Sequence, residues 1–180
     1  FVDGIGTVAK FNNPTGISVD NTGNILVVDN QNNRIRIISP AGMVSTLAGS
    51  TPGYNDGVGS AAQFYYPVGI CADTFGNSYI ADSSSHRIRK ITSTGTVTTI
   101  AGNSVLGSTG SYADGIGTSA LFSYPYGIAV DDSGTIYVAD TGNQKIRKIT
   151  TSGVVTTIAG ILGAGYVDGN GNLAKFYSPQ

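Results

Sequence analysis

Four short glycine-rich segments could cradle a phosphate group. The first, GIGTVA at residues 4–9, matches the G-x-G-x-x-A pattern of a dinucleotide-binding turn, and similar segments stand at 57–62, 115–120 and 169–174. A dinucleotide-binding turn occurs once per fold and opens a long helix, whereas a Phe and a Pro soon follow each of these segments and end any helix early. We therefore predict structured linkers that each contain one helical turn. The predicted N-caps are Thr7, Ser60, Thr118 and Asn172, and the predicted apolar anchors are Phe11, Phe64, Phe122 and Phe176.

Aspartate is the only acidic residue type, and it recurs at fixed places. One set precedes glycine in the linkers, where Asp-Gly is typical of a turn, and comprises Asp3, Asp56, Asp114 and Asp168. The stretch DGNGN at 168–172 resembles a calcium loop but lacks its acidic density and closing Glu. We predict no cofactor, with bound calcium as the weaker alternative. A further set, Asp20, Asp73 and Asp131, is predicted to open hairpin turns.

A third set of aspartates ends an apolar run and stands five residues before a basic residue. Its members are Asp29, Asp82 and Asp140, followed by Arg34, Arg87 and Lys145. We predict that each Asp caps a turn and faces the base across a hairpin. The alternative places these six residues at one rim of the fold, in contact with a ligand.

Eight of the ten basic residues lie in RIRI (34–37), RIRK (87–90) and KIRK (145–148). Strand alternation puts Arg34 and Arg36 on one face, so repetition would build a basic stripe. The net charge is −1, and no aromatic residues are interleaved for base stacking. We therefore predict salt bridges and solvation on an outer strand, and no nucleic-acid partner.

Tyrosine is concentrated between the apolar runs. Its polar tip and apolar ring suit contacts with protein or sugar. The residues predicted to form a binding surface are Tyr54, Tyr65, Tyr66, Tyr112, Tyr124 and Tyr166, with Tyr177 nearby. The alternative is that these rings seal the joints between repeats.

Few residues could support catalysis, and we predict no catalytic residue and no metal site. The chain has one histidine, His86, which excludes sites that need several. Cys71 follows Ile70 in an apolar run, which indicates an inert, buried thiol. No apolar run approaches the ~20 residues of a membrane helix, so we predict no membrane insertion.

Internal repeats dictate the elements that hold these residues. FNNPTGISVD (11–20), FYYPVGICAD (64–73) and FSYPYGIAVD (122–131) are one motif, and FYSPQ (176–180) begins a fourth copy. Four short apolar runs separated by Gly, Asp and Asn turns follow each motif, which predicts an all-β chain of four-stranded, up-and-down antiparallel blades. The predicted blades are 14–49, 67–102 and 125–160. The predicted linkers are 1–13, 50–66, 103–124 and 161–180, the last including the start of a next repeat.

Two long segments resemble NHL repeats: VGICADTFGNSYIADSSSHRIRKI (68–91) and YGIAVDDSGTIYVADTGNQKIRKI (126–149). The linkers resemble the long variety found in bacterial secreted and surface proteins. His86 matches the family's histidine, which Asn33 and Gln144 replace in the other repeats. The resemblance implies a β-propeller, usually of six blades, so three blades make a half-propeller. It also implies an extracellular or cell-surface location.

The function implied by this resemblance is a non-catalytic scaffold that contacts protein or glycan. The alternatives are a metal-dependent six-bladed enzyme, similar to a lactonase or lyase, and an RNA-binding propeller. Three blades leave two open apolar faces. We therefore predict self-association, either as a dimer that completes a ring or as a larger array.

Overall fold

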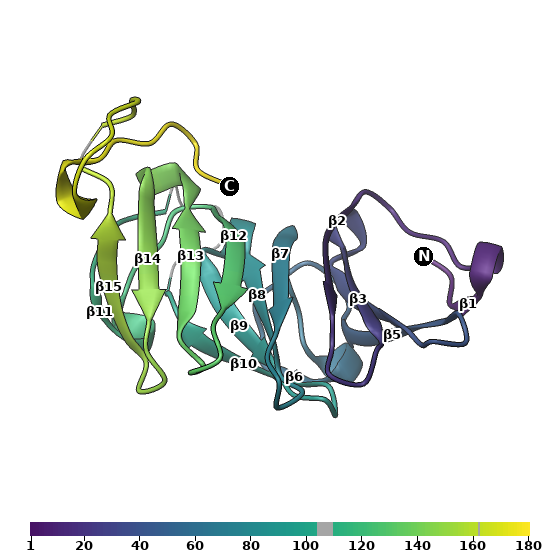
Figure 1. Ribbon diagram of the computed structural model, residues 1–180. Helices are drawn as coiled ribbons and strands as arrows, with labels where there is room; N and C mark the ends of the chain where they lie inside the picture. The colour runs from purple at the N-terminus through teal and green to yellow at the C-terminus, as the bar shows by residue number, and fades with distance from the viewer. Residues whose placement is uncertain (104–109, 162) are drawn as a thin grey trace.

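Three antiparallel β-sheets stand side by side like blades (Figure 1). The computed structural model describes residues 1–103, 110–161 and 163–180. The first sheet contains β1 (Gly4–Ile5), β2 (Pro14–Val19), β3 (Ile25–Asp29), β4 (Arg34–Ile38) and β5 (Met43–Gly49). The second contains β6 (Gly57–Val58), β7 (Pro67–Ala72), β8 (Ser78–Asp82), β9 (Arg87–Ile91) and β10 (Thr96–Ala101). The third contains β11 (Gly115–Ile116), β12 (Pro125–Val130), β13 (Ile136–Asp140), β14 (Lys145–Ile149) and β15 (Val154–Ala159).

The all-β, up-and-down prediction is confirmed, with one addition to each sheet. The strand order β1-β5-β4-β3-β2 shows four successive strands plus a two-residue strand at the outer edge. That short strand comes from the preceding linker, as when Gly4 pairs with Val44 of β5. A two-residue pairing leaves no periodic signal in the sequence, so it was not predicted.

The linkers contain the predicted helical turns, as 3₁₀ helices, but the predicted caps are wrong. The helices are η1 (Gly6–Val8), η3 (Gly59–Ala61), η5 (Gly117–Ser119) and η7 (Gly171–Leu173), and none has a side-chain cap. In the first, Gly6 takes a left-handed φ of 54° and donates its N–H to the Gly42 carbonyl at 3.0 Å. A backbone carbonyl of the neighbouring hairpin thus accepts from this helix end, and Thr7, which was expected to accept as the N-cap, lies inside the helix.

Two apolar cores fill the spaces between neighbouring sheets. The first joins Leu26, Val28 and Ile35 of the first sheet to residues of the second, and it includes the linker residue Phe64. The second core repeats this arrangement with Phe122. Both phenylalanines are fully buried. Each linker is therefore anchored between the two sheets that it connects.

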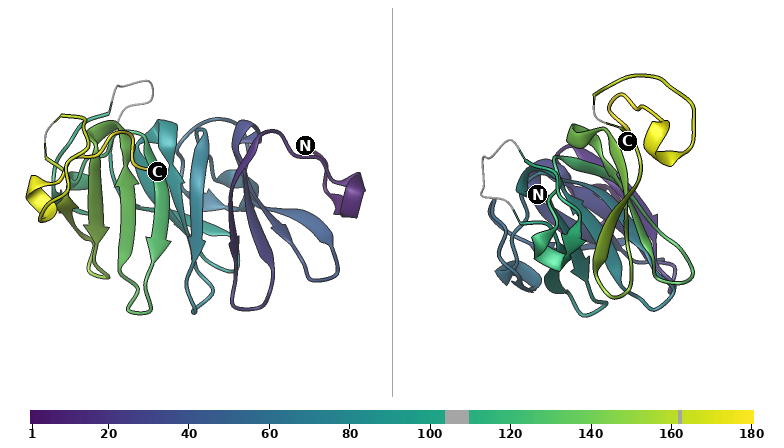
Figure 2. Two further views of the ribbon diagram at one scale, coloured as in Figure 1. Left: turned by 45° about the horizontal axis from the view of Figure 1, so that its top comes forward. Right: turned by 90° about the vertical axis from the view of Figure 1, so that its left-hand side faces the viewer.

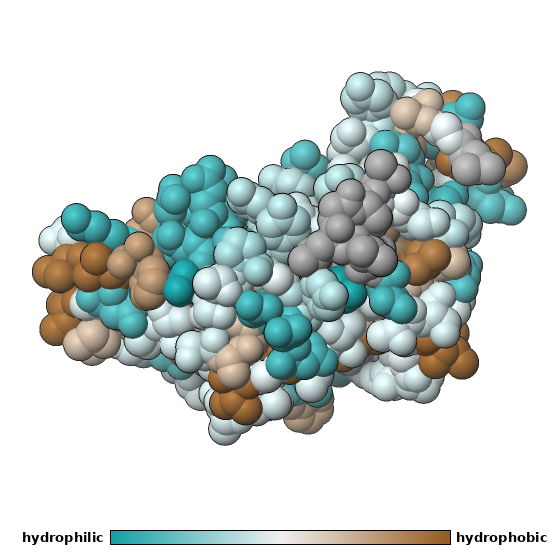
Figure 3. Space-filling model, turned by 180° about the vertical axis from the view of Figure 1, so that it is seen from behind, coloured by the Kyte–Doolittle hydropathy of each residue, from teal (hydrophilic) through white to brown (hydrophobic). Residues whose placement is uncertain are grey.

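In the part of the chain that the structure describes, no sheet covers the outermost faces of the first and third sheets. Ile17 of β2 is 68% exposed, whereas Ile70, its counterpart in β7, is 6% exposed. Phe11, Ile17, Val27 and Ile38 line an open apolar hollow of about 330 Å³ on the first sheet. Figure 3 shows hydrophobic surface gathered at the end of the molecule that carries the N-terminus. At the other end, residues 163–180 curl beside the third sheet (Figure 2).

The aspartates that open the first hairpin of each sheet are organising residues. Asp73 accepts hydrogen bonds from the backbone N–H groups of Phe75 and Asn77, the Asn77 amide and the Tyr79 hydroxyl, at 2.8–3.0 Å. Burial opposes ionisation, but these bonds outweigh it and lower the pKa of Asp73. Asp20 and Asp131 also have lowered pKa values, with hydrogen bonds from their own turns.

We expect Asp73→Asn to destabilise the protein by about 1 kcal/mol at neutral pH, because the ionised carboxylate is the better acceptor. Because the pKa of Asp73 is lower in the folded than in the unfolded state, its ionisation stabilises the folded protein fully at pH values above the unfolded-state pKa. This stabilisation is lost as the pH falls through the folded-state pKa. The difference between wild type and variant should therefore shrink as the pH falls below the ordinary Asp pKa of about 4, and disappear once the pH passes the lower pKa of the folded state. Urea unfolding between neutral pH and this acidic range measures the difference in the free energy of unfolding. Asp132→Asn is the control, because Asp132 is an exposed aspartate in the corresponding turn of the third sheet. A difference that does not change with pH would contradict this assignment.

Candidate functional site

Each sheet holds one fully buried arginine in the third of its four long strands, which is β4, β9 or β14. These residues, all 0% exposed, are Arg36, Arg89 and Arg147. Nη1 of each pairs with a buried aspartate of the second strand, at 2.9, 3.0 and 2.7 Å: Asp29, Asp82 and Asp140. Nη2 of each pairs with a half-exposed linker aspartate, at 2.6, 2.8 and 2.8 Å: Asp3, Asp56 and Asp114. One guanidinium thus links two strands of a sheet to the linker that precedes it.

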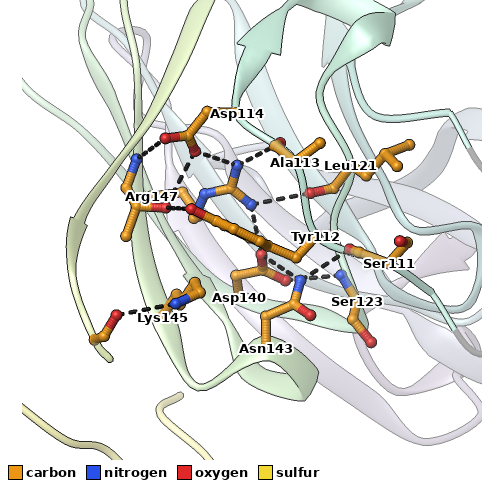
Figure 4. A network of polar contacts seen from close by, with 12 residues as sticks. Ser111, Tyr112, Ala113, Asp114, Leu121, Ser123, Asp140, Asn143, Lys145 and Arg147 are labelled. Atoms are coloured by element: carbon orange, nitrogen blue, oxygen red, sulfur yellow. Dashed lines mark hydrogen bonds and ion pairs between the residues drawn. The ribbon is translucent and has the colours of Figure 1, made fainter. Parts of the chain in front are cut away.

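The third sheet shows the complete coordination of this arginine (Figure 4). Besides its two aspartates, Arg147 donates from Nη1 to the Leu121 carbonyl at 2.9 Å and from Nη2 to the Ala113 carbonyl at 2.7 Å. Its guanidinium carbon lies 4.8 Å from the centre of the Phe122 ring. Nε of this arginine and of its two counterparts has no partner within the described ranges. Four charge-assisted bonds offset much of the cost of burying the cation.

An aromatic residue two positions before the linker aspartate completes the arrangement. It stacks on the first basic residue of the third strand, as Phe1 does on Arg34, with 3.7 Å between guanidinium carbon and ring centre. Tyr54 repeats this contact with Arg87 at 4.3 Å. Lys145 Nζ lies 4.7 Å from the centre of the Tyr112 ring (Figure 4). We name this unit the arginine clasp. It consists of an aromatic residue, the Asp two positions after it and the Phe ten positions after it, which together surround a buried arginine.

The clasp qualifies two predictions. Asp29 faces Arg34 across the β-ladder, as predicted, but its carboxylate pairs with Arg36. Arg34 instead donates to the Asn32 carbonyl at 2.6 Å. Arg36 sits two positions along on the same face, and its long side chain reaches diagonally to the carboxylate. The basic stripe was predicted to be solvated, yet its central arginines are buried, so they form no exposed surface for phosphates.

The inner and outer aspartates of the clasp differ in electrostatics. Burial raises the pKa of Asp82 to about 6, against the opposing pull of Arg89. Burial likewise raises the pKa of Asp140. Burial opposes ionisation of Asp56 too, but hydrogen bonds from Thr99 and Arg89 outweigh it and lower its pKa. The inner carboxylates are engaged and inaccessible, which removes Asp29, Asp82 and Asp140 from the candidate ligand contacts.

The tyrosines fall into three structural groups. Tyr54 and Tyr112 each use one ring face in a clasp. Tyr66 and Tyr124 directly precede β7 and β12 and are 43% and 44% exposed. The ring of Tyr65 lies 5.1 Å from that of Tyr66, between ring centres. The third group lies near the C-terminus, where Tyr166 and Tyr177 stack on each other at 6.3 Å.

The residues at the family's histidine position have a shared role that the sequence did not reveal. Asn33 Oδ1 accepts from the Tyr66 N–H, and His86 Nδ1 accepts from the Tyr124 N–H, both at 2.9 Å. Gln144 accepts from the Ser178 N–H in the same way. Each therefore bonds to the segment that enters the next repeat. The position requires a suitably placed acceptor on a residue that adopts a left-handed φ of 53–58°, and three residue types meet these conditions here.

Other reactive chemistry is sparse in the part of the chain that the structure describes. No group of three or more His, Cys, Asp or Glu side chains there is placed to hold a metal ion. Burial raises the pKa of the Cys71 thiol to about 12, which keeps it protonated and a poor nucleophile. Within the described ranges, no helix has the length and apolarity needed to cross a bilayer.

The NHL repeat model matches residues 11–38 and 122–149, which carry β2–β4 and β12–β14. The chain is an NHL-repeat domain. It is 33% identical over 152 residues to the SUPPRESSOR OF QUENCHING 1 protein of Arabidopsis thaliana, a match that covers 78% of this chain and 14% of that protein.

Solved structures match the NHL fold over almost the whole chain. A Bacteroides thetaiotaomicron protein of unknown function aligns with a TM-score of 0.74 and 24% identity, over 93% of this chain and 41% of the other. An auxiliary nutrient binding protein of Bacteroides ovatus aligns with a TM-score of 0.72 and 21% identity, over 95% of this chain and 43% of the other. The chain thus spans less than half of the length of each of these proteins.

The clasp should dominate the stability of this NHL domain. Arg89→Met leaves Asp82 buried without its cation, and we expect a loss of about 3–5 kcal/mol. Asp56→Asn removes only the half-exposed partner and should cost about 1 kcal/mol. Urea unfolding measures both changes. The double variant Asp82→Asn/Arg89→Met should recover part of the loss, and equal costs for the two single variants would contradict the clasp.

Proposed function

We propose that this NHL domain is a non-catalytic binding module in which Tyr66 and Tyr124 contact a neutral ligand, a glycan or a protein surface. The observation that carries the proposal is their backbone conformation. Both have a left-handed φ, 47° for Tyr66 and 48° for Tyr124. Bulky residues rarely adopt this conformation, and strain of this kind is concentrated at functional sites.

The fold itself does not require tyrosine at this position. The equivalent residues of the first and last repeats are Asn13 and Ser178, with φ values of 53° and 49°. Asparagine tolerates this conformation better than tyrosine does. Tyrosine is thus less favourable for the backbone at positions 66 and 124 than asparagine is at position 13. Burial does not fully compensate for this cost, because roughly half of each tyrosine faces solvent. An exposed ring with a hydroxyl tip suits stacking on a sugar or packing on a protein.

The surrounding charges support a neutral ligand. The central arginines and inner aspartates neutralise each other inside the clasps, and the net charge is −1. Contact with the ligand therefore falls to aromatic faces and hydroxyl groups, to which Tyr65 adds a ring beside Tyr66. The nutrient-binding protein of Bacteroides ovatus, which shares the fold, lends support to a binding role. The proposed extracellular or surface location rests on the resemblance of the long linkers alone.

The proposal also includes self-association through the open faces of the first and third sheets. A three-bladed segment exposes apolar surface that a complete ring would bury. We expect light scattering on the purified chain to give twice the monomer mass of 18.4 kDa at micromolar concentration. A larger array would give a higher mass, and a monomer would contradict self-association.

Ligand binding is tested with Tyr66→Asn and Tyr124→Asn, which install the residue that the first repeat already carries. We expect wild type to bind members of a neutral glycan array or a peptide array. The double variant should lose at least tenfold in affinity while its melting temperature stays equal or rises, because Asn fits the left-handed conformation. Tyr126→Asn, on β12, serves as a matched control. Equal binding by wild type and double variant, or no binding to either array, would contradict the proposal.

A further inference from the structure

The C-terminal segment repeats every linker part of the arginine clasp but encloses no arginine. Tyr166, Asp168 and Phe176 have the same spacing as Tyr112, Asp114 and Phe122. The third sheet, which precedes them, already uses its arginine with Asp114. Asp168 makes no hydrogen bond or ion pair within residues 1–103, 110–161 and 163–180. A fourth clasp is therefore present without its cation.

The bridged part of this fourth clasp has the conformation of the filled ones, whereas Gly171 does not adopt the left-handed φ of 54–55° seen at Gly6, Gly59 and Gly117. Val167 and Lys175 form the same antiparallel bridge as Val2 and Lys10 in the first clasp, with bonds of 3.3 and 2.9 Å. Their counterparts Ala113 and Leu121 supply the two carbonyls that bind Arg147. The loop is thus organised before any guanidinium arrives, which lowers the entropic cost of binding.

A hollow of about 500 Å³ lies where the arginine would enter. It is lined by Tyr166, Val167, Asp168, Lys175, Phe176 and neighbouring residues. These include the carboxylate and both aromatic rings that surround a guanidinium elsewhere in the chain. Tyr166 is 87% exposed, against 41% for Tyr54, whose ring is covered by Arg87. The difference matches a missing cation.

We propose that residues 166–179 form a preformed receptor for an arginine side chain, and that it takes Arg36 of a second copy of this chain. The proposal rests on the self-association proposed above and assigns its point of attachment. The first sheet of the second copy would then stand against the third sheet of the first copy, as the second sheet stands against the first.

The open faces fit this arrangement. Val27 and Ile38, which line the exposed hollow of the first sheet, correspond to Ile80 and Ile91, which are fully buried against the neighbouring sheet. On the third sheet, Tyr137 and Ile146 are partly exposed, whereas their counterparts Tyr79 and Ile88 pack in the core. The new contact would continue an interface that the chain already forms twice.

Attachment requires an exchange of clasps. Arg36 is held by Asp3 of its own chain, so residues 1–13 must leave the first sheet when residues 166–179 of the other copy arrive. The exchange replaces one set of ion pairs and carbonyl bonds with an equivalent set. Burial of the two apolar faces is the net gain, and it favours the associated form.

Three single variants test the exchange by sedimentation equilibrium of the full chain. Asp168→Asn removes the receptor carboxylate at an exposed site and should raise the dimer dissociation constant at least tenfold. Asp3→Asn weakens the competing clasp and should lower that constant several-fold. Asp132→Asn removes the same charge at an exposed turn and should leave it within about twofold.

The opposite effects of Asp168→Asn and Asp3→Asn separate the exchange from general destabilisation, which would weaken the dimer in both variants. A dimer that Asp168→Asn does not affect overturns the receptor and leaves self-association standing. Weakening by Asp3→Asn also overturns it. A wild-type chain that stays monomeric overturns both self-association and the receptor. Binding through Tyr66 and Tyr124 is judged separately on the arrays.

Discussion

A buried guanidinium between two carboxylates is the interaction on which the rest of this structure depends. A cation without solvent must have its hydrogen bonds supplied by the protein, or the fold pays a large desolvation penalty. Arg89 draws its bonds from a strand aspartate, a linker aspartate and two linker carbonyls. The linker therefore has to follow one path across the outer edge of the sheet. The long, glycine-rich linkers would otherwise have no defined conformation, and these bonds order them as part of the blade.

That path places the apolar anchors correctly. Once Asp56 is bound to Arg89, the chain turns through a 3₁₀ helix and brings Phe64 into the core between the first two sheets. The centre of the Phe64 ring also lies 5.3 Å from the guanidinium carbon of Arg89. The polar clasp and the apolar core are thus joined through one side chain. Repetition of the unit allows sheets to be added one after another, with each buried between its neighbours.

The clasp also decides what remains for function. Most of the strongly patterned charged side chains pair inside the blades, so neither the central arginines nor the inner aspartates are accessible to a ligand. The surface that is left is rich in hydroxyl, amide and tyrosine groups. Tyr66 and Tyr124 are distinguished from the other tyrosines because no clasp contact accounts for them and their backbone conformation favours a smaller residue. Function is therefore expected at exposed aromatic rings on a rigid scaffold.

The sequence by itself determined the repeat, the all-β class, the strand positions and the anchors Phe64 and Phe122, because periodic apolar runs and turn residues are local signals. Phe11 and Phe176, predicted as anchors by the same motif, are only partly buried. The sequence also showed that the glycine-rich segments belong to linkers. Tertiary structure alone decided that Asp29 pairs with Arg36 and not with Arg34, and that Asp3 closes the same cluster from 33 residues away. Side-chain reach and burial depend on how the linker folds back over the sheet, and spacing within one strand does not encode that path. The same reason hid the empty fourth clasp, since Tyr166 and Asp168 match their counterparts in sequence and differ only in what lies against them.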